Sequence, residues 1–285
     1  MKKSSDKIIF IIDYLENLLF TFKNIKEFQQ NHDEYIIKLR NINRNNNDIP
    51  AYLYPFVIKG YKFFNNDKNK LHELFHLWEI LAVRNEVVRT RADIRDRLKN
   101  CLLTFDGDME KLRNSFRDKI DKEDYWYYWS DVCFKSSVVN MLFGHKMIPY
   151  ILWEYENTLQ NKGYKTNVNV TIDYDSIEHI SPQTPREYSL GYETNEDYNY
   201  SDDFKDHYLN NIGNLMLISR SHNCSIGNKP FSEKLKSYKD NPILSQQAEI
   251  SSFLTDGKEE WKSEQITKRR DKIVKMAMER WSFDY

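Results

Sequence analysis

The sequence lacks paired cysteines. It has 285 residues and three cysteines, Cys101, Cys133 and Cys224, and no two of them form a Cys-x-x-Cys pair. An odd number of cysteines without such a pair excludes a disulfide framework and a zinc ribbon. We therefore expect a protein of the reducing cytoplasm.

Long apolar runs are also missing. No window reaches the roughly 18 uninterrupted apolar residues that a membrane-spanning helix needs. Near the N-terminus, the apolar run Ile8–Ile12 is followed closely by Asp13 and Glu16. The pattern predicts no contact with a membrane and no signal peptide.

The chain has almost no net charge, because 42 Lys and Arg are balanced by 43 Asp and Glu. Non-specific coating of nucleic acid depends on neutralising many phosphates, so any nucleic-acid contact has to use a local patch. The best candidate patch contains Arg84, Arg91 and Arg95, which are spaced to share one helical face. Acidic residues are interleaved with them, so a solvated, salt-bridged helix is the alternative interpretation.

Helical periodicity dominates residues 6 to 160, as in Leu71, Leu74, Phe75 and Trp78. With 40% hydrophobic and 14% aromatic residues, the chain has ample material for a core. From residue 168 to 181 the pattern changes and predicts extended chain. We find no internal repeat.

The most informative pattern combines an acid, an imidazole and two amides. Glu178 and His179 are adjacent, and Asn214 is followed nine positions later by Asn223. Cleaving a phosphodiester requires a base that works near pH 7 and a hard cation at the phosphate. An imidazole suits the first task because its ordinary pKa is about 6.5. Carboxylate and amide oxygens match Mg²⁺ or Mn²⁺ better than Zn²⁺.

The order of these residues resembles the HNH endonuclease site, in which two strands and a helix hold one metal. It is most similar to the C-terminal HNH domain of the GmrSD-type restriction endonucleases. The resemblance is carried by residues 177–183, 211–218 and 223–228, by Pro230, Phe231 and Lys234, and by Trp261, Ile266, Arg269, Ile273 and Trp281 near the C-terminus. It extends over roughly residues 50 to 285.

The resemblance implies a role for each site residue. His179 would be the general base, and Glu178 and Asn223 would hold Mg²⁺ or Mn²⁺. Asn214 would hold the loop and orient the imidazole. His222, one position before Asn223, is the alternative metal ligand.

Two lysines follow in the same region. Lys229 and Lys234 could contact phosphate as point charges, with ordinary solvated lysines as the alternative.

The fold implied is mainly α, with a small ββα-metal unit of the HNH, or His-Me finger, type. We expect a helical domain over residues 1–170, the nuclease unit over 171–240, and a C-terminal helical segment over 241–285 that packs back on the core.

The function implied is metal-dependent hydrolysis of DNA, in an anti-phage restriction system that acts on foreign or modified DNA. In the GmrSD family this half works with an N-terminal domain that binds and hydrolyses nucleotide. The signature of that domain is missing here, so we expect a separate recognition subunit, or a nuclease half that stands alone or is truncated.

Other functions stay open. The chain could be a regulatory or binding subunit with an inactive site, or it could cut RNA. The stretch from His72 to His76 also fits the H-E-x-x-H pattern of zinc proteases. No glycine and third histidine follow at the metzincin spacing, and Leu74, Phe75 and Trp78 predict that this helix is buried in a bundle.

Overall fold

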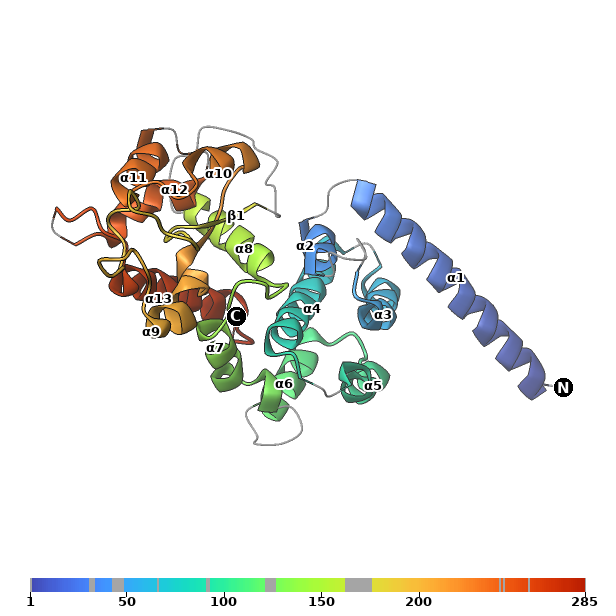
Figure 1. Cartoon of the computed structure of the whole chain (residues 1–285). Helices are drawn as coiled ribbons and strands as arrows, with labels where there is room; N and C mark the ends of the chain where they lie inside the picture. The colour runs from blue at the N-terminus through green and yellow to red at the C-terminus, as the bar shows by residue number, and fades with distance from the viewer. Residues whose placement is uncertain are drawn as a thin grey trace. The chain divides into compact units, whose positions relative to one another are not determined.

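The structure is a computed structural model that describes residues 2–30, 34–42, 49–65, 67–90, 93–120, 127–161, 176–240, 242, 244–255 and 257–284. Within these ranges the chain is mainly helical and contains one two-stranded sheet (Figure 1). The predicted mainly α class is confirmed. The chain divides into two compact units: Met1–Phe134 with Trp281–Tyr285, and Lys135–Arg280.

The regular elements described in the first unit are all helices. Its elements are α1 (Lys2–Gln30), α2 (Glu34–Ile42), η2 (Ala51–Leu53), α3 (Tyr54–Phe64), α4 (Lys68–Val88), α5 (Ile94–Thr104), α6 (Met109–Ile120), η3 (Tyr127–Trp129) and the start of α7 (Asp131–Val139). Helix α4 contacts α2, α3 and α6 and lies at the centre of the unit. It begins after Asp67, whose side chain accepts hydrogen bonds from the backbone N–H groups of Asn69 and Lys70.

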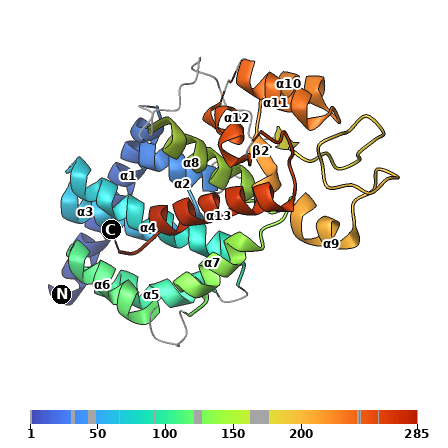
Figure 2. The same ribbon diagram turned by 90° about the vertical axis from the view of Figure 1, so that its left-hand side faces the viewer.

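The second unit contains the sheet and the remaining helices. They are α8 (Ile148–Asn161), β1 (Ile177–His179), α9 (Asp202–Phe204), η4 (Lys205–Leu209), η5 (Ile212–Asn214), β2 (Leu215–Leu217), α10 (Arg220–Ile226), α11 (Phe231–Asp240), α12 (Ser245–Glu249), η6 (Ile250–Phe253) and α13 (Ser263–Arg280). Helices α8 and α13 contact each other and run side by side in Figure 2.

Strands β1 and β2 are antiparallel, and α10 follows β2 directly. Glu178 lies opposite Met216, and His179 lies opposite Leu215. Helix α10 begins after Ser219, whose hydroxyl accepts a hydrogen bond from the backbone N–H of His222. The predicted extended residues before Ser176 and the predicted domain boundary at 170/171 lie outside the described part of the chain. The boundary at 240/241 follows Asp240, the last residue of α11, and both boundaries stay predictions.

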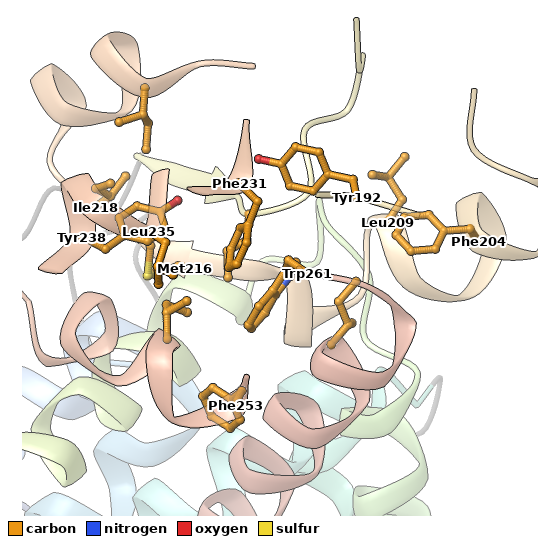
Figure 3. Close-up of a cluster of buried hydrophobic side chains, with 14 of the residues drawn as sticks. Tyr192, Phe204, Leu209, Met216, Ile218, Phe231, Leu235, Tyr238, Phe253 and Trp261 are labelled. Carbon is orange, nitrogen blue, oxygen red and sulfur yellow. The ribbon is translucent and has the colours of Figure 1, made fainter. Parts of the chain in front are cut away.

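Buried aromatic and aliphatic side chains surround the sheet in the second unit (Figure 3). Trp261 lies at their centre, with its ring stacked 5.8 Å from that of Phe231 and edge-on to Phe253. Met216 and Ile218 contribute to the same cluster from β2 and the residue after it. Each such side chain contributes about 1.5–3 kcal/mol when it leaves water, so the cluster holds β2 firmly in place.

The segment Ile212–Asn214 is pressed against α13. A Cβ at Gly213 would lie 2.2 Å from the carbonyl oxygen of Ile266, so only glycine allows this approach. Arg269 of α13 is fully buried, and its guanidinium donates to the carbonyl oxygens of Gly213 and Leu215 at 3.0 and 2.6 Å. Arg269 therefore ties α13 to the start of β2.

None of the described helices combines the length and apolar character required to cross a lipid bilayer.

Candidate active site

Glu178 of β1 is buried, with only 4% of its surface exposed, and it is paired with a lysine. The Nζ atom of Lys234, on α11, lies 2.5 Å from Oε1 of Glu178. The hydroxyl of Tyr238 donates to the same oxygen at 3.2 Å. Burial raises the pKa of the Glu178 carboxyl, and the Lys234 ammonium opposes that rise. Both of these contacts use Oε1.

Lys234 also binds the end of β1. Its fully buried ammonium donates to the carbonyl oxygens of His179 and Ile180 at 3.0 and 3.2 Å. The sequence predicts a phosphate contact for this lysine. In the structure its ammonium is buried and binds Glu178 and two backbone carbonyls instead. Lys229, the other predicted phosphate contact, is exposed.

The His179 imidazole is also largely buried, with 9% of the residue exposed. Its Nε2 lies 3.2 Å from Oδ1 of Asn210, and the Phe143 ring packs edge-on at 4.7 Å between centroids. Burial lowers the pKa of His179 to about 4, although the hydrogen bond to Asn210 acts in the opposite direction. The ring is therefore neutral at pH 7, which is the form that can accept a proton.

Asn214 holds the chain that leaves β1. Its Oδ1 accepts hydrogen bonds from the Ser181 backbone N–H at 2.8 Å and from Nε1 of Trp261 at 3.0 Å. Its Nδ2 donates to the carbonyl oxygens of Ser181 and Leu209 at 3.1 and 2.8 Å. Both ends of the amide are thus used to hold backbone and Trp261. The contact to the imidazole that the sequence predicts for Asn214 is made by Asn210.

Asn223 and His222 are neighbours on α10 but face different parts of the unit. Nδ2 of Asn223 donates to the Ile177 carbonyl at 3.3 Å and to the Ser176 hydroxyl at 3.4 Å, so this side chain lies against β1. His222 places Nε2 2.7 Å from the Ser237 hydroxyl and Nδ1 3.0 Å from Nε2 of Gln247, on α11 and α12. Asn223 therefore lies beside the strand that carries Glu178, and both ring nitrogens of His222 are engaged elsewhere.

These donors suit a hard cation. The carboxylate of Glu178 and the amide of Asn223 offer oxygen donors, and Mg²⁺ is commonly held by one or two protein oxygens together with phosphate oxygens and water. Across the described ranges, no group of three or more His, Cys, Asp or Glu side chains could hold a metal ion. A closed zinc site of four protein ligands does not fit this donor set.

The predicted arginine patch is not a continuous surface. Arg84 is fully buried, and its guanidinium donates to the carbonyl oxygens of Trp281 and Trp129 and to the Asp131 carboxylate. Its charge faces the interior of the first unit, so it cannot reach a phosphate in this structure. Arg95 is exposed and paired with Asp93. Arg91 lies outside the described residues.

The zinc-protease pattern on α4 is engaged in other contacts. Glu73, the residue that would act as base, forms an ion pair with Arg113. The His72 ring packs on Tyr35 at 4.7 Å, and His76 lies 3.4 Å from Glu79. These contacts are those of a buried helix in a bundle.

Two residues near the imidazole are absent from the sequence-based prediction. Asn210 is one of three asparagines between 210 and 214, and no spacing rule singles it out. Phe143 lies 36 positions before His179 in a turn that follows α7, and only the fold brings the two rings together.

One short strand thus carries a buried carboxylate and a largely buried imidazole, and the Asn223 amide lies against it. The family model described as GmrSD restriction endonucleases, C-terminal domain, matches residues 110–276, which is more than half of the chain. The chain belongs to this family, so the resemblance in the sequence is confirmed. The family indicates a restriction-type nuclease whose substrate is DNA. No curated protein and no solved structure matches the chain.

Proposed function

We propose that the protein is a metal-dependent HNH endonuclease that hydrolyses DNA phosphodiester bonds as the nuclease component of an anti-phage restriction system. The observation that carries this proposal is the largely buried imidazole of His179 at the end of β1, next to Glu178 and on the strand against which Asn223 packs. In this proposal β1, β2 and α10 are the two strands and the helix of a ββα-metal unit.

His179 is the general base that takes a proton from the attacking water. Its lowered pKa keeps the ring in the proton-accepting form before DNA binds. A bound phosphodiester brings negative charge close to the ring, which raises the pKa toward the operating pH, where a general base is most effective.

Glu178 and Asn223 would hold Mg²⁺ or Mn²⁺, which when bound neutralises charge on the phosphate. Lys234 and Tyr238 keep the Glu178 carboxylate in one position by binding Oε1. Asn214 holds the loop after β1 through the Ser181 backbone and is itself held by Trp261.

The exposed Lys229 after α10 is the proposed phosphate contact in this unit, with exposed Arg95 as a second candidate in the first unit. A separate nucleotide-hydrolysing subunit would supply recognition of modified DNA, and the cytoplasm is the proposed location.

Nicking of supercoiled plasmid tests the proposal. Wild-type protein with Mg²⁺ or Mn²⁺ should cut and EDTA should stop it, while His179→Ala should lower the rate by about 10²–10⁴-fold, the contribution of a general base. His207→Ala is the matched control, since His207 is an exposed histidine of the same unit paired with Asp203. Equal cutting by His179→Ala and wild type would rule out the assigned base.

A second candidate is a binding or regulatory subunit whose site does not cut. One observation favours it: Lys234 already neutralises the carboxylate that would take the metal. Plasmid binding without cutting, in the presence of Mg²⁺ and of Mn²⁺, would support this candidate. An RNA substrate in the same assay separates a DNase from an RNase.

A further inference from the structure

Asn210 lies in the turn between η4 and η5 and contacts the His179 ring directly. Its Oδ1 lies 3.2 Å from Nε2 of His179. Its backbone carbonyl accepts a hydrogen bond from the Phe143 N–H at 2.7 Å, and the Phe143 ring packs on the imidazole at 67°. One residue therefore binds the imidazole and also fixes the aromatic ring that packs against it.

The partner atom determines where the imidazole proton lies. A neutral imidazole carries one N–H, and an amide oxygen can only accept a hydrogen bond. The contact with Oδ1 of Asn210 therefore places the proton on Nε2. The lone pair is then on Nδ1, the nitrogen that can accept a proton.

We propose that Asn210 and Phe143 are positioning residues for His179, which hold the ring in the Nε2–H tautomer so that Nδ1 takes the proton from the attacking water. This inference rests on the proposed function. It assigns Nδ1 of His179 as the atom that accepts the proton. It also gives Asn210 and Phe143, which lie outside the segments 178–179 and 213–214, a supporting role in catalysis.

The segments that carry the two residues are held together by backbone contacts. Leu142 pairs with Asn211 in an antiparallel bridge, and the Ile212 N–H donates to the Met141 carbonyl at 3.2 Å. The Asn211 amide bonds to the Val139 carbonyl and to the Gly213 N–H. Asn211 is thus a neighbouring, buried asparagine that holds only backbone, which makes it the matched control.

Nitrogen-15 NMR of the histidine rings in metal-free protein tests the tautomer without any need for activity. Comparison with His179→Gln assigns the ring. We expect Nε2 of His179 to be protonated in wild type, in Asn210→Asp, which keeps an acceptor, and in Asn211→Ala. In Asn210→Leu, which has a similar volume and no acceptor, the Nδ1–H form should become populated. A protonated Nδ1 in wild type would overturn the inference.

Kinetics on plasmid provide the second readout. Asn210→Leu should lower kcat by about 10–100-fold, the usual cost of losing such a supporting partner, with KM changed less than about twofold. Asn210→Asp should recover most of kcat, and Phe143→Leu should show a smaller loss than Asn210→Leu. Suppose that Asn210→Leu shows a shifted tautomer but full kcat, while His179→Ala is inactive. That result would overturn the positioning role of Asn210 and leave the proposed function intact. Full activity in His179→Ala would instead remove the proposed function and leave the NMR result standing.

Discussion

Each of the two units buries a cation that the sequence pattern assigns to nucleic acid. In the first unit, Arg84 binds two backbone carbonyls and the Asp131 carboxylate. In the second unit, Lys234 also binds two backbone carbonyls and one carboxylate, that of Glu178. The two cations donate to the same kinds of group, but the carboxylates they bind differ. The Asp131 side chain is exposed to solvent. Glu178 is buried and precedes His179 in the sequence.

Buried charge alone therefore does not identify an active site. The contacts of Arg84 hold the chain end at Trp281 against η3, and they leave no buried carboxylate whose second oxygen could take a ligand. The contacts of Lys234 fix the carboxylate of Glu178, which follows Ile177 and precedes His179 on the strand against which Asn223 packs. We therefore interpret Arg84 as structural and Lys234 as part of the proposed site.

The largest effect is expected for Lys234→Met. Removing one partner of a buried ion pair leaves an uncompensated charge and costs about 3–5 kcal/mol. Two carbonyls at the end of β1 also lose their donor. Urea unfolding should show the loss of stability, and plasmid cutting should fall with it even where the protein is folded.

Lys234→Met combined with Glu178→Gln sharpens this prediction. The double variant removes both charges, so most of the stability should return while cutting stays low. If cutting returned together with stability, Lys234 and Glu178 would have the same purely structural role as Arg84.

The next effect is a dependence of stability on pH. Burial lowers the pKa of His179 to about 4 in the folded chain, below the value of about 6.5 in the unfolded chain. Between these values the unfolded chain binds a proton that the folded chain does not. Stability should therefore fall as pH drops from about 6.5 to 4, by about 3 kcal/mol in total, with no further loss from this group below pH 4.

Urea unfolding of metal-free wild type and His179→Gln across this window measures the effect. The difference between the two proteins is the quantity to follow, because Glu178 and the other carboxyls titrate in both. The same slope in both proteins would show that the His179 ring is not buried as a neutral group.

Part of this site can be predicted from the sequence, because some of its residues belong to short local patterns. Helical periodicity identifies the mainly α class. Glu178 and His179 are adjacent in the sequence, so the pair can be recognised without a structure. The spacing to Asn223 also selects the side chain that lies against β1. These signals depend on near neighbours or on a fixed interval.

The rest depends on contacts between distant residues. Lys234 follows Glu178 by 56 positions. From the sequence alone, a lysine in an amphipathic helix is expected to face solvent. Only the packing of α11 against β1 brings it to Glu178. Trp281, the partner of Arg84, follows it by 197 positions. Asn210 and Asn214 have the same side chain, and only the direction of the turn decides which amide faces the imidazole.

A smaller effect is expected for Arg84→Met, which tests the structural side of the comparison. Its three hydrogen bonds involve two buried carbonyls and an exposed carboxylate, so no buried charge is left behind. Each stranded carbonyl costs about 1–3 kcal/mol. Unfolding in urea should show a loss of at least about 2 kcal/mol, while the cutting rate per folded molecule should equal that of wild type. A lower rate in fully folded Arg84→Met would give this arginine a role in DNA binding after all.

The smallest effect separates the two neighbours on α10. Asn223→Ala removes an oxygen donor beside β1, whereas His222→Ala removes a ring whose nitrogens bind Ser237 and Gln247. The Mg²⁺ concentration for half-maximal cutting should rise about tenfold in Asn223→Ala, which corresponds to the loss of about 1.4 kcal/mol of binding free energy. In His222→Ala that concentration should stay at the wild-type value, with a loss of stability instead. A reversed result would move the metal ligand to His222 and require α10 to turn from the orientation seen here.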